Sequence, residues 1–438
     1  MPPGMRLEIA DFPVSEICFS KAFAYENGVL EVDRQELTNL ILQDSRVLEV
    51  SFAVVHPGER VRVTGIRDVV EPRVKVAGQG QVFPGTLTEV APVGEGRTHR
   101  LSGMAVFPTA AFQGQARAGL LVQRSAILDM WGPGAAASKF SNLAGLVLIL
   151  KLAEELSDWD YHSAIQTAEF KTARRLAEVT IDKTPANIEV LDNRRIAAGL
   201  PKVVLVQGCI AHAEGFHSGI SYYGMPVRES LATYVHPNEL IDGVFASSAT
   251  RAVGYFPITW DWQNHPLSLN LYRAHGKTLN FLGVVFERIQ FEVFRNKEII
   301  AQNTAGLVRQ LGADGALVAW TGSGNAFVDL MLTVQACEKR GIRTVLVSYE
   351  FGGKDGIDSP LLFYVPEATA AVSTGSRDRW LELPEPERII GPYERFSVLS
   401  YPGAPLVEAK GPLTLDARDL IVGGVDNWGA RDWQCAVY

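Results

Sequence analysis

Cysteine is scarce in this sequence, and no two cysteines are close together. The 438 residues include four of them, Cys18, Cys209, Cys337 and Cys435. No pair forms a CxxC motif, so the commonest structural zinc and thiol–disulfide signatures are excluded. We expect free thiols in a reducing, cytoplasmic setting.

The chain also lacks basic runs, a leader-like start and long apolar stretches. It carries 41 Lys and Arg against 49 Asp and Glu, a net charge of −8, which argues against a nucleic-acid partner. The N-terminus has no basic region followed by an apolar stretch, so we expect no targeting segment. The longest apolar run, residues 143–152, is about half the ~20 residues of a membrane helix. We expect a buried strand or helix there and no contact with a membrane.

The remaining composition is that of an ordinary globular protein. Hydrophobic residues make up 47% and charged residues 21% of the chain, and its length allows two or three domains. Apolar and polar residues alternate in 60–64 and 72–76, which predicts strands in a β-rich N-terminal domain over 1–145. Residues 146–200 are expected to form a helical connector, with one amphipathic helix over 164–179.

From residue 201 the pattern changes to strands alternating with helices. We expect strands at 202–206, 279–286, 316–320 and 342–347. Helices are predicted from Asn296, as its cap, to 311, and over 326–340. This order implies a mainly parallel sheet with right-handed crossovers. The predicted fold class is therefore α/β: a β-rich N-terminal domain followed by an α/β domain over 201–438.

A parallel sheet predicts where an active site lies. Ligands bind in the crevice outside the carboxyl ends of the strands. Those ends are predicted at 207–218, after Phe286, at 321–325 and at 348–355. Each segment could equally be a simple connecting loop.

The first of these segments is rich in metal-type ligands. Cys209, His212, Glu214 and His217 lie within nine residues and supply the donors that a divalent transition metal prefers. Their spacing is not a known zinc signature, and the alternative is hydrogen-bonded structural histidines. Three further histidines are candidates to join such a site: His236, His265 and His275.

Two other segments carry candidate polar groups. The small residues of 321–325 let backbone amides approach an anion at a helix N-terminus, so Asn325 is a candidate for binding a substrate carboxylate. The alternative is a tight turn with Asn325 as helix cap. Glu350 follows a buried strand, and partial burial would suit it as a general acid or base. An ion pair with Lys354 is the competing interpretation.

In the N-terminal domain, Arg97 and His99 stand out inside strand-rich sequence. An arginine binds a carboxylate through two parallel hydrogen bonds, so both residues are candidates for substrate binding. Surface ion pairs or subunit contacts are the alternative.

Several segments together resemble one known family. They are residues 57–62, 68–76, 94–99, 127–135, 273–281 and 389–391. In order and spacing they are similar to the alpha/beta-subunit precursor of component B of the glycine, sarcosine and betaine reductases, and more distantly to the D-proline reductase precursor.

The resemblance implies a function. In that family component B selects the substrate amine, and its precursor splits at a cysteine to form a pyruvoyl group. A separately encoded subunit supplies the nucleophile that displaces the amine. We accordingly expect a hetero-oligomeric enzyme with a separate catalytic subunit and a small amine or amino-acid derivative as substrate.

This sequence departs from the family at the processing position. Counted from Asp242-Gly243, Thr250 occupies the place of the cysteine, and no cysteine lies between Cys209 and Cys337. Elimination at a threonine would leave a 2-oxobutyryl group, whereas Ser247 or Ser248 would give pyruvoyl if cleavage moved. The simplest expectation is an uncleaved chain without a pyruvoyl group.

Three hypotheses for the function follow. The first is the substrate-binding subunit of a component B-like reductase, which cleaves a C–N bond together with its partner. The second is a metal-dependent hydrolase or lyase acting on a C–N bond without reduction. The third is a non-catalytic scaffold for a partner enzyme.

Overall fold

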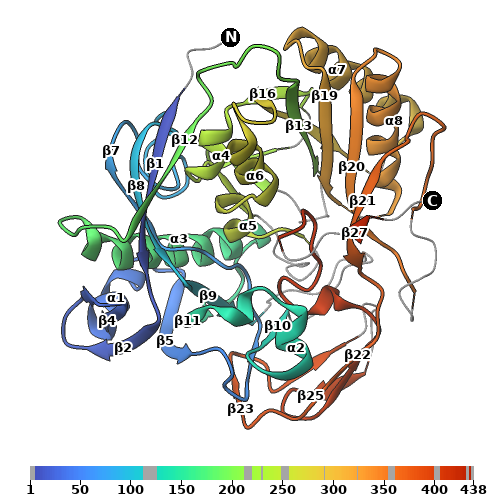
Figure 1. The fold of residues 1–438 in the computed structure, drawn as a ribbon. Helices are drawn as coiled ribbons and strands as arrows, with labels where there is room; N and C mark the ends of the chain where they lie inside the picture. Colours follow the sequence, from blue (N-terminus) through green and yellow to red (C-terminus); the bar gives the residue numbers. More distant parts are fainter. Residues whose placement is uncertain are drawn as a thin grey trace.

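The computed structural model describes residues 5–111, 126–211, 220–227, 230–247, 256–290, 292–322, 324–353, 361–398, 405–430 and 434–435. Several small sheets formed by the N-terminal half lie on one side of the molecule, and one large sheet lies on the other (Figure 1). This arrangement confirms the predicted α/β class with a mainly parallel sheet. Among the described residues, no helix is long and apolar enough to cross a membrane.

Two sheets and a long helix form the N-terminal half. The first sheet has the strand order β12 (Asn187–Asp192), β1 (Arg6–Pro13), β8 (Gly96–Ser102) and β7 (Arg73–Ala77), and the second has β5 (Val47–Val55), β11 (Ala144–Leu152) and β9 (Met104–Ala110). Helix α3 (Asp158–Ala177) packs against both sheets. Ser157 caps α3, because its side chain accepts a hydrogen bond from the Asp160 backbone amide. The apolar run predicted as strand or helix is therefore strand β11.

Short elements surround these sheets. Strands β2 (Glu16–Ser20), β4 (Val29–Asp33) and β3 (Ala24–Glu26) form a small sheet, followed by helix α1 (Arg34–Ile41). Short 3-10 turns occur at η1 (Phe140–Asn142) and η2 (Glu178–Thr180). The segment predicted as a helical connector thus contains α3 together with the end of β11 and all of β12.

The C-terminal tail returns to the N-terminal half. Strand β23 (Arg388–Ile390) pairs with β6 (Val61–Thr64), whose other neighbour is β10 (Ile127–Asp129). Around them lie helix α2 (Gly132–Ala137), the pair β22 (Leu381–Leu383) and β26 (Leu413–Leu415), the pair β24 (Arg395–Ser397) and β25 (Leu406–Glu408), and η4 (Arg418–Leu420). Arg62 fixes this junction: it binds both Asp129 carboxylate oxygens, at 2.7 and 2.9 Å, and donates to the Ala409 and Gly411 carbonyls.

The large sheet has seven strands. Their order is β16 (Thr233–Val235), β18 (Asn280–Ile289), β13 (Lys202–Ile210), β19 (Gly315–Thr321), β20 (Arg343–Glu350), β21 (Ala371–Ser376) and β27 (Gln434–Cys435). The five central strands are parallel, and the edge strands β16 and β27 are antiparallel to their neighbours. All ten residues of β18 are buried, as expected for a strand covered on both faces.

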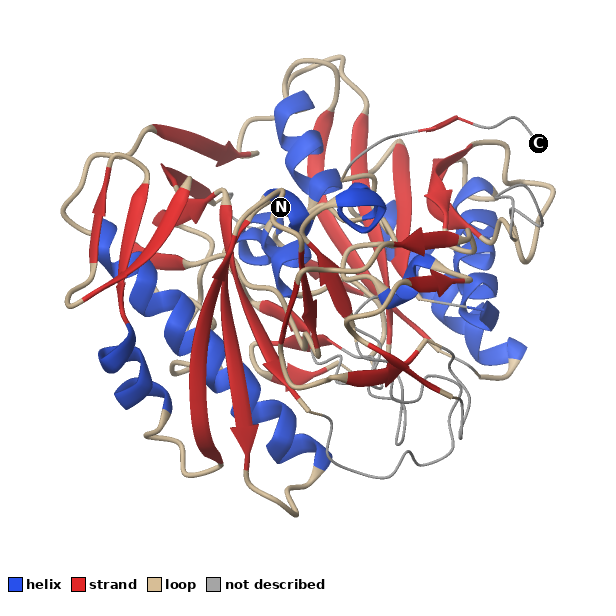
Figure 2. Ribbon diagram, turned by 90° about the horizontal axis from the view of Figure 1, so that it is seen from below, coloured by secondary structure: helices blue, strands red, loops and turns tan. Residues whose placement is uncertain are grey.

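Helices cover both faces of this sheet. Helices α7 (Phe294–Gln310) and α8 (Phe327–Glu338) pack against each other and against β18, β19 and β20. The opposite face is covered by α4 (Pro237–Ile241), α5 (Thr259–Gln263) and α6 (Pro266–Ala274), together with the small sheet β15 (Met225–Pro226), β14 (Ile220–Tyr222) and β17 (Phe245–Ser247). In Figure 2, which views the molecule from below, helices lie beside the strands.

The predicted helix cap at Asn296 is wrong, and so is the alternative interpretation that Asn325 caps the following helix. Helix α7 begins at Phe294 after Val293, and Asn296 lies inside it, where its side chain donates to Glu292 instead of capping the helix. Asn325 lies in the 3-10 turn η3 (Gly324–Ala326), and the capping residue of α8 is Ala326, which makes no side-chain cap. In each case the helix starts without a polar cap, so the cap signal pointed to the wrong residue.

Candidate functional site

The carboxyl ends of the central strands meet at one edge of the large sheet. Cys209, near the end of β13, is in register with Arg288 of β18 on one side and Thr321 of β19 on the other. The chain leaves β13 toward β18 but leaves β19 toward β20, in opposite directions. In such sheets the usual ligand position is where the chain changes direction, which here is at the ends of β13 and β19.

Cys209 is deeply buried at this edge. Its side chain has no exposed surface, and burial raises the pKa of its thiol well above the usual value, although contacts with Thr321 and Gln207 oppose the rise. The thiol is therefore held in its protonated form, which is the poorer metal ligand and nucleophile. Of the predicted metal ligands, only Cys209 lies among the described residues; His212, Glu214 and His217 lie outside them. The metal site stays a prediction.

The three further histidines that were candidates for a metal site each accept a hydrogen bond from a backbone amide. Nδ1 of His236 accepts a hydrogen bond from the Asn238 amide at 3.1 Å, and Nδ1 of His265 accepts one from the Ser268 amide at 3.3 Å. They cap α4 and α6. Nδ1 of His275 accepts from the Phe281 amide at 2.9 Å. Burial lowers the pKa of His236 to about 4 and that of His265 to about 3, so both are neutral at pH 7.

The paired strands β14 and β17 adjoin the two segments that the sequence analysis selected, the one with His212 to His217 and the one with Thr250. Ile220, the first residue of β14, pairs with Ser247, the last residue of β17. The residues immediately before Ile220 include His212 to His217, and Thr250 follows Ser247 by three residues. Thr250 itself lies outside the described residues. The segment carrying His212 to His217 therefore ends, and the segment carrying Thr250 begins, at adjacent points of one ladder.

A buried pair of carboxyl groups lies beside Ser247. Asp68 and Glu169 are both at most 1% exposed, and their carboxyl groups are hydrogen bonded to each other. The Thr259 hydroxyl donates to Asp68 Oδ2 at 2.5 Å and accepts from the Ser247 amide at 3.0 Å. The Gln166 side chain donates to the Ser247 carbonyl at 3.2 Å. The backbone amide and the backbone carbonyl of Ser247 are thus each hydrogen bonded to a buried side chain.

Desolvation dominates the chemistry of this acid pair. It raises the pKa of Asp68 to about 7, although hydrogen bonds from Thr259, Val69 and Glu169 oppose it. It raises the pKa of Glu169 well above the usual value, and the neighbouring Asp68 charge adds to the rise. Two carboxyl groups in contact in a dry site share a proton near neutral pH, which is the arrangement of an acid–base pair.

Asp242 anchors the chain ahead of the same segment. Its carboxylate accepts hydrogen bonds from the Lys75 ammonium, the Gly94 amide at 2.8 Å and the Thr98 hydroxyl at 2.5 Å. Gly243 follows with φ +92°, a conformation that favours glycine. The Asp-Gly pair is therefore a fixed turn between the N-terminal sheets and strand β17.

A buried ion pair joins α7 to α8 near the end of β18. The Lys297 ammonium contacts Asp329 Oδ2 and donates to the Gln290 carbonyl at 2.5 Å, and both charged side chains are 2% exposed. Burial raises the pKa of Asp329 to about 6, with Lys297 opposing the rise. The pair fixes the starts of both helices at the carboxyl edge of the sheet.

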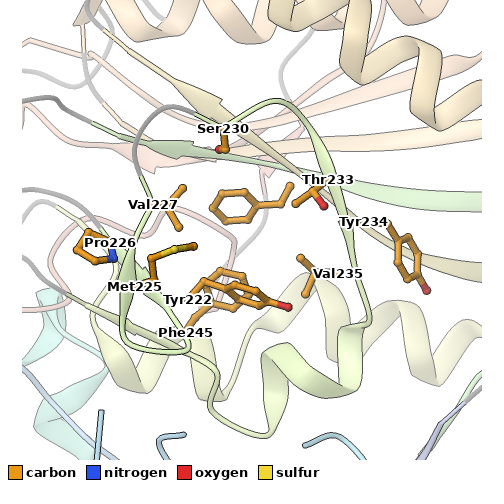
Figure 3. Close-up of a pocket in the computed structure, with 10 residues that line it drawn as sticks. Tyr222, Met225, Pro226, Val227, Ser230, Thr233, Tyr234, Val235 and Phe245 are labelled. Carbon is orange, nitrogen blue, oxygen red and sulfur yellow. The ribbon is translucent and has the colours of Figure 1, made fainter. Parts of the chain in front are cut away.

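A cavity of about 420 Å³ lies next to edge strand β16 (Figure 3). Its lining comes from the β14–β15 hairpin, the segment leading into β16, strand β16 itself, and single residues of β17 and β18. The lining residues are Tyr222, Met225, Pro226, Val227, Ser230, Thr233, Tyr234, Val235, Phe245 and Phe286. The cavity thus shares β14 and β17 with the ladder at the acid pair.

The other predicted site residues have defined surroundings. Glu350 is the half-buried last residue of β20, and its carbonyl accepts from the Arg377 amide at 2.9 Å. Asn325 is exposed at the start of α8. Arg97 pairs with Glu8, with Nε 2.7 Å from Oε2, and His99 is a buried side chain whose Nδ1 lies 3.1 Å from Thr180. Catalytic or substrate-binding roles for these residues stay predictions.

Sequence reasoning missed the acid pair and the cavity. Asp68 and Glu169 are 101 positions apart and nothing local marks either as buried. Asp68 follows Arg67 and lies three residues before Glu71, so its neighbourhood resembles an ordinary charged surface segment. The aromatic residues of the cavity are spread over 65 positions, from 222 to 286, and carry no common motif.

Comparison with known proteins identifies the family. The family described as glycine/sarcosine/betaine reductase component B subunits matches residues 5–432. The chain is 32% identical over 394 residues to glycine reductase complex component B subunits alpha and beta of Acetoanaerobium sticklandii, covering 88% of this chain and 89% of that protein.

Two proteins of Peptoclostridium acidaminophilum are similar as well. Sarcosine reductase complex component B subunit alpha is 31% identical, covering 97% of this chain and 98% of that protein, and betaine reductase complex component B subunit alpha is 32% identical, covering 90% and 89%. No solved structure matches. From the match over nearly all its length, this chain belongs to the family of glycine/sarcosine/betaine reductase component B subunits.

Proposed function

We propose that this chain is the substrate-binding subunit of a component B-like reductase. It binds a small amine or amino-acid derivative and cleaves its C–N bond together with a separate catalytic subunit, without a pyruvoyl group. One observation carries the proposal: at the β14–β17 ladder the end of the segment with His212 to His217 lies next to the start of the segment with Thr250, beside a buried acid pair and an aromatic cavity.

The residues present do not suit a pyruvoyl group. By the resemblance to the family, Thr250 takes the place of the processing cysteine, and elimination at a threonine would give a 2-oxobutyryl group instead of pyruvoyl. Ser247 would give pyruvoyl, but its amide and carbonyl are both hydrogen bonded and it belongs to a strand pair. Cleavage at Ser247 would have to open that ladder. We therefore route no step of the reaction through a carbonyl on this chain.

The proposed reaction divides the work between two proteins. This chain holds the substrate so that the carbon next to nitrogen faces the partner. A nucleophile of the partner attacks that carbon, and the electron pair of the broken C–N bond goes to nitrogen. A positively charged nitrogen leaves as a neutral amine, and the carbon stays bound to the partner's nucleophile. Two thiols then reduce this adduct: the carbon leaves with the electron pair of its bond and takes up a proton, the thiols are oxidised to a disulfide, and the partner's nucleophile is restored. The acid pair keeps the Ser247 end of the ladder in place during this step.

Amine release by the native complex tests this function. We expect the complex, purified through a tag on this chain, to contain a second subunit and to release amine only when a thiol is supplied. Full activity of this chain alone would contradict the proposal.

Metal content separates this function from the metal-dependent alternative. Elemental analysis of the purified complex, compared with a His212→Ala variant, gives the answer. One equivalent of a transition metal that disappears in the variant, with amine release independent of thiol, would favour a metal-dependent C–N hydrolase or lyase instead.

A further inference from the structure

Two structural units hold the Ser247 peptide from opposite sides. Thr259 belongs to the first unit, since its amide donates to Asp68 Oδ1 at 2.9 Å and its hydroxyl donates to Asp68 Oδ2. The same hydroxyl accepts the hydrogen bond of the Ser247 amide. Gln166 belongs to the second unit, helix α3, and its side chain donates to the Ser247 carbonyl. The position of this peptide therefore depends on how Asp68 lies relative to α3.

The contact between Asp68 and Glu169 joins the two units. Glu169 lies on α3 three positions after Gln166, and its carboxyl group is hydrogen bonded to that of Asp68. Two carboxylates have no hydrogen atom to share, so this bond exists only while the pair keeps at least one proton. Glu169 Oε2 is buried and makes no hydrogen bond within the described part of the chain. A second negative charge there would lack a donor to stabilise it, and the two carboxylates would repel each other.

Few other charges act on the pair. Among the residues that the structure describes, Asp68 is the only charged group that shifts the pKa of Glu169. Histidine is the side chain that ordinarily titrates between about pH 5 and 8, and burial lowers the pKa of His99, so His162 is the group to control for. In the β6–β7 loop, β7, β8, α5 and α3, the other buried titratable groups are Arg67, which donates to the Ala110 carbonyl, Arg73 with Glu71, Lys75 with Asp242, Asp261 with Lys139, His99 with Thr180, Tyr161 and His162.

We propose that Asp68, Glu169 and Thr259 form a proton-dependent latch, which fixes the Ser247 peptide while the carboxyl pair holds a proton and frees it when that proton goes to solvent. The inference rests on the proposed function for the role of this segment and adds regulation of the same site by pH. Ser247 is the last residue of β17, and the chain continues from it to Thr250. Loss of the proton separates the two units, so the two hydrogen bonds to the peptide cannot both persist.

The direction of the pH effect follows from the burial of the pair. Burial raises the pKa of Asp68 to about 7 and that of Glu169 well above its usual value, whereas in an opened, hydrated site both would titrate near pH 4. The closed latch therefore binds more protons than the open one. Its stability is complete below about pH 4 and is lost as the pH rises through the closed-state pKa of Asp68, about 7.

Hydrogen–deuterium exchange of the native complex tests the latch at its own hydrogen bonds. Exchange of the peptide that contains Ser247, corrected for the intrinsic dependence of exchange on pH, is compared at pH 5.5 and pH 8. We expect its protection factor to fall roughly ten-fold more in the wild type than in Glu169→Gln, whose amide carries no charge and can still donate to Asp68. A peptide from α7, which packs against α8 and β18, should show no such difference.

Matched substitutions at Thr259 examine its link to Ser247. Thr259→Val keeps the shape of the side chain but removes the hydroxyl, so protection of the Ser247 peptide should fall about ten-fold at pH 5.5 and lose its dependence on pH. Thr259→Ser keeps the hydroxyl and should behave as the wild type. His162→Gln should keep the wild-type pH dependence. Thermal unfolding shows which variants are folded, and Asp68→Asn removes the same shared proton if Glu169→Gln does not fold.

The outcomes separate the latch from the proposed function. Equal pH dependence in the wild type and Glu169→Gln, unchanged protection in Thr259→Val, or loss of the pH effect in His162→Gln but not in Glu169→Gln would each overturn the latch. Amine release from glycine, sarcosine and betaine is measured on the same samples. The expected exchange pattern without amine release would support the latch and count against the reductase function. Thiol-dependent amine release without the exchange pattern would overturn the latch and leave that function intact.

Discussion

Asp68 and Glu169 stand out in the described structure, because two buried carboxyl groups contact each other and Asp68 accepts hydrogen bonds from the Val69 amide and from Thr259 rather than from a basic side chain. Their raised pKa values mean that the folded protein holds protons that the unfolded chain releases. Stability from this source is fully present below about pH 4 and is lost as pH rises through the folded pKa of Asp68, about 7.

The upward direction of these pKa shifts gives a prediction for a single residue. Between pH 5.5 and pH 8 the free energy of unfolding of the wild type should fall by roughly 1–3 kcal/mol more than that of Glu169→Gln, whose amide cannot ionise. Denaturant unfolding at the two pH values measures it. Replacement of exposed Glu16 by Gln is the control and should follow the wild type. Parallel pH profiles for wild type and Glu169→Gln would contradict a shared proton.

At the scale of elements, the sequence predicted the four strands β13, β18, β19 and β20 of the large sheet and the helices α7 and α8, but not the helix caps or the outer strands β16, β21 and β27. Buried aliphatic runs such as β13 and β20 are visible in the sequence because both faces of a parallel strand are covered. The start of α7 was misplaced, because Asn296 has a cap-forming side chain that bonds to Glu292 instead. Pairings between distant segments, such as β1 with β12 and β6 with β23, leave no local pattern.

The same limit applies to the candidate site. The sequence identified the strand-end segments, because strand order alone determines that they share an edge. It did not identify the acid pair, whose members come from a loop and from α3, or the capping roles of His236 and His265. These depend on which helix ends meet in the folded chain.

The ion pair between α7 and α8 gives an element-scale prediction. Asp329→Ala should lower the free energy of unfolding by about 3–5 kcal/mol, because it leaves the buried Lys297 ammonium without its partner. The double variant Lys297→Met with Asp329→Leu should recover most of that loss. Denaturant unfolding measures both.

An exposed ion pair provides the control for this experiment. Arg395 and Glu408 are 57% and 68% exposed, so Glu408→Ala should change stability by less than about 1 kcal/mol. A double variant as unstable as Asp329→Ala would show that packing, rather than the uncompensated charge, determines the loss.

At the scale of the whole molecule, the C-terminal tail packs against the N-terminal half. Arg62 and strand β23 tie the C-terminal segment to the N-terminal half, and Asp242 ties the chain ahead of Thr250 to β7 and β8. Strand β17 precedes residue 250, whereas β18 to β21 follow it. A cleaved product would therefore have to stay assembled through the ladders of the large sheet and this tail.

Whether the chain is cut is the central question, and intact-mass spectrometry of the native protein answers it most directly. We predict a single species at 47.9 kDa with no keto group that reacts with a hydrazine. Two fragments divided near residue 250, one of them starting with a hydrazine-reactive group, would contradict the account.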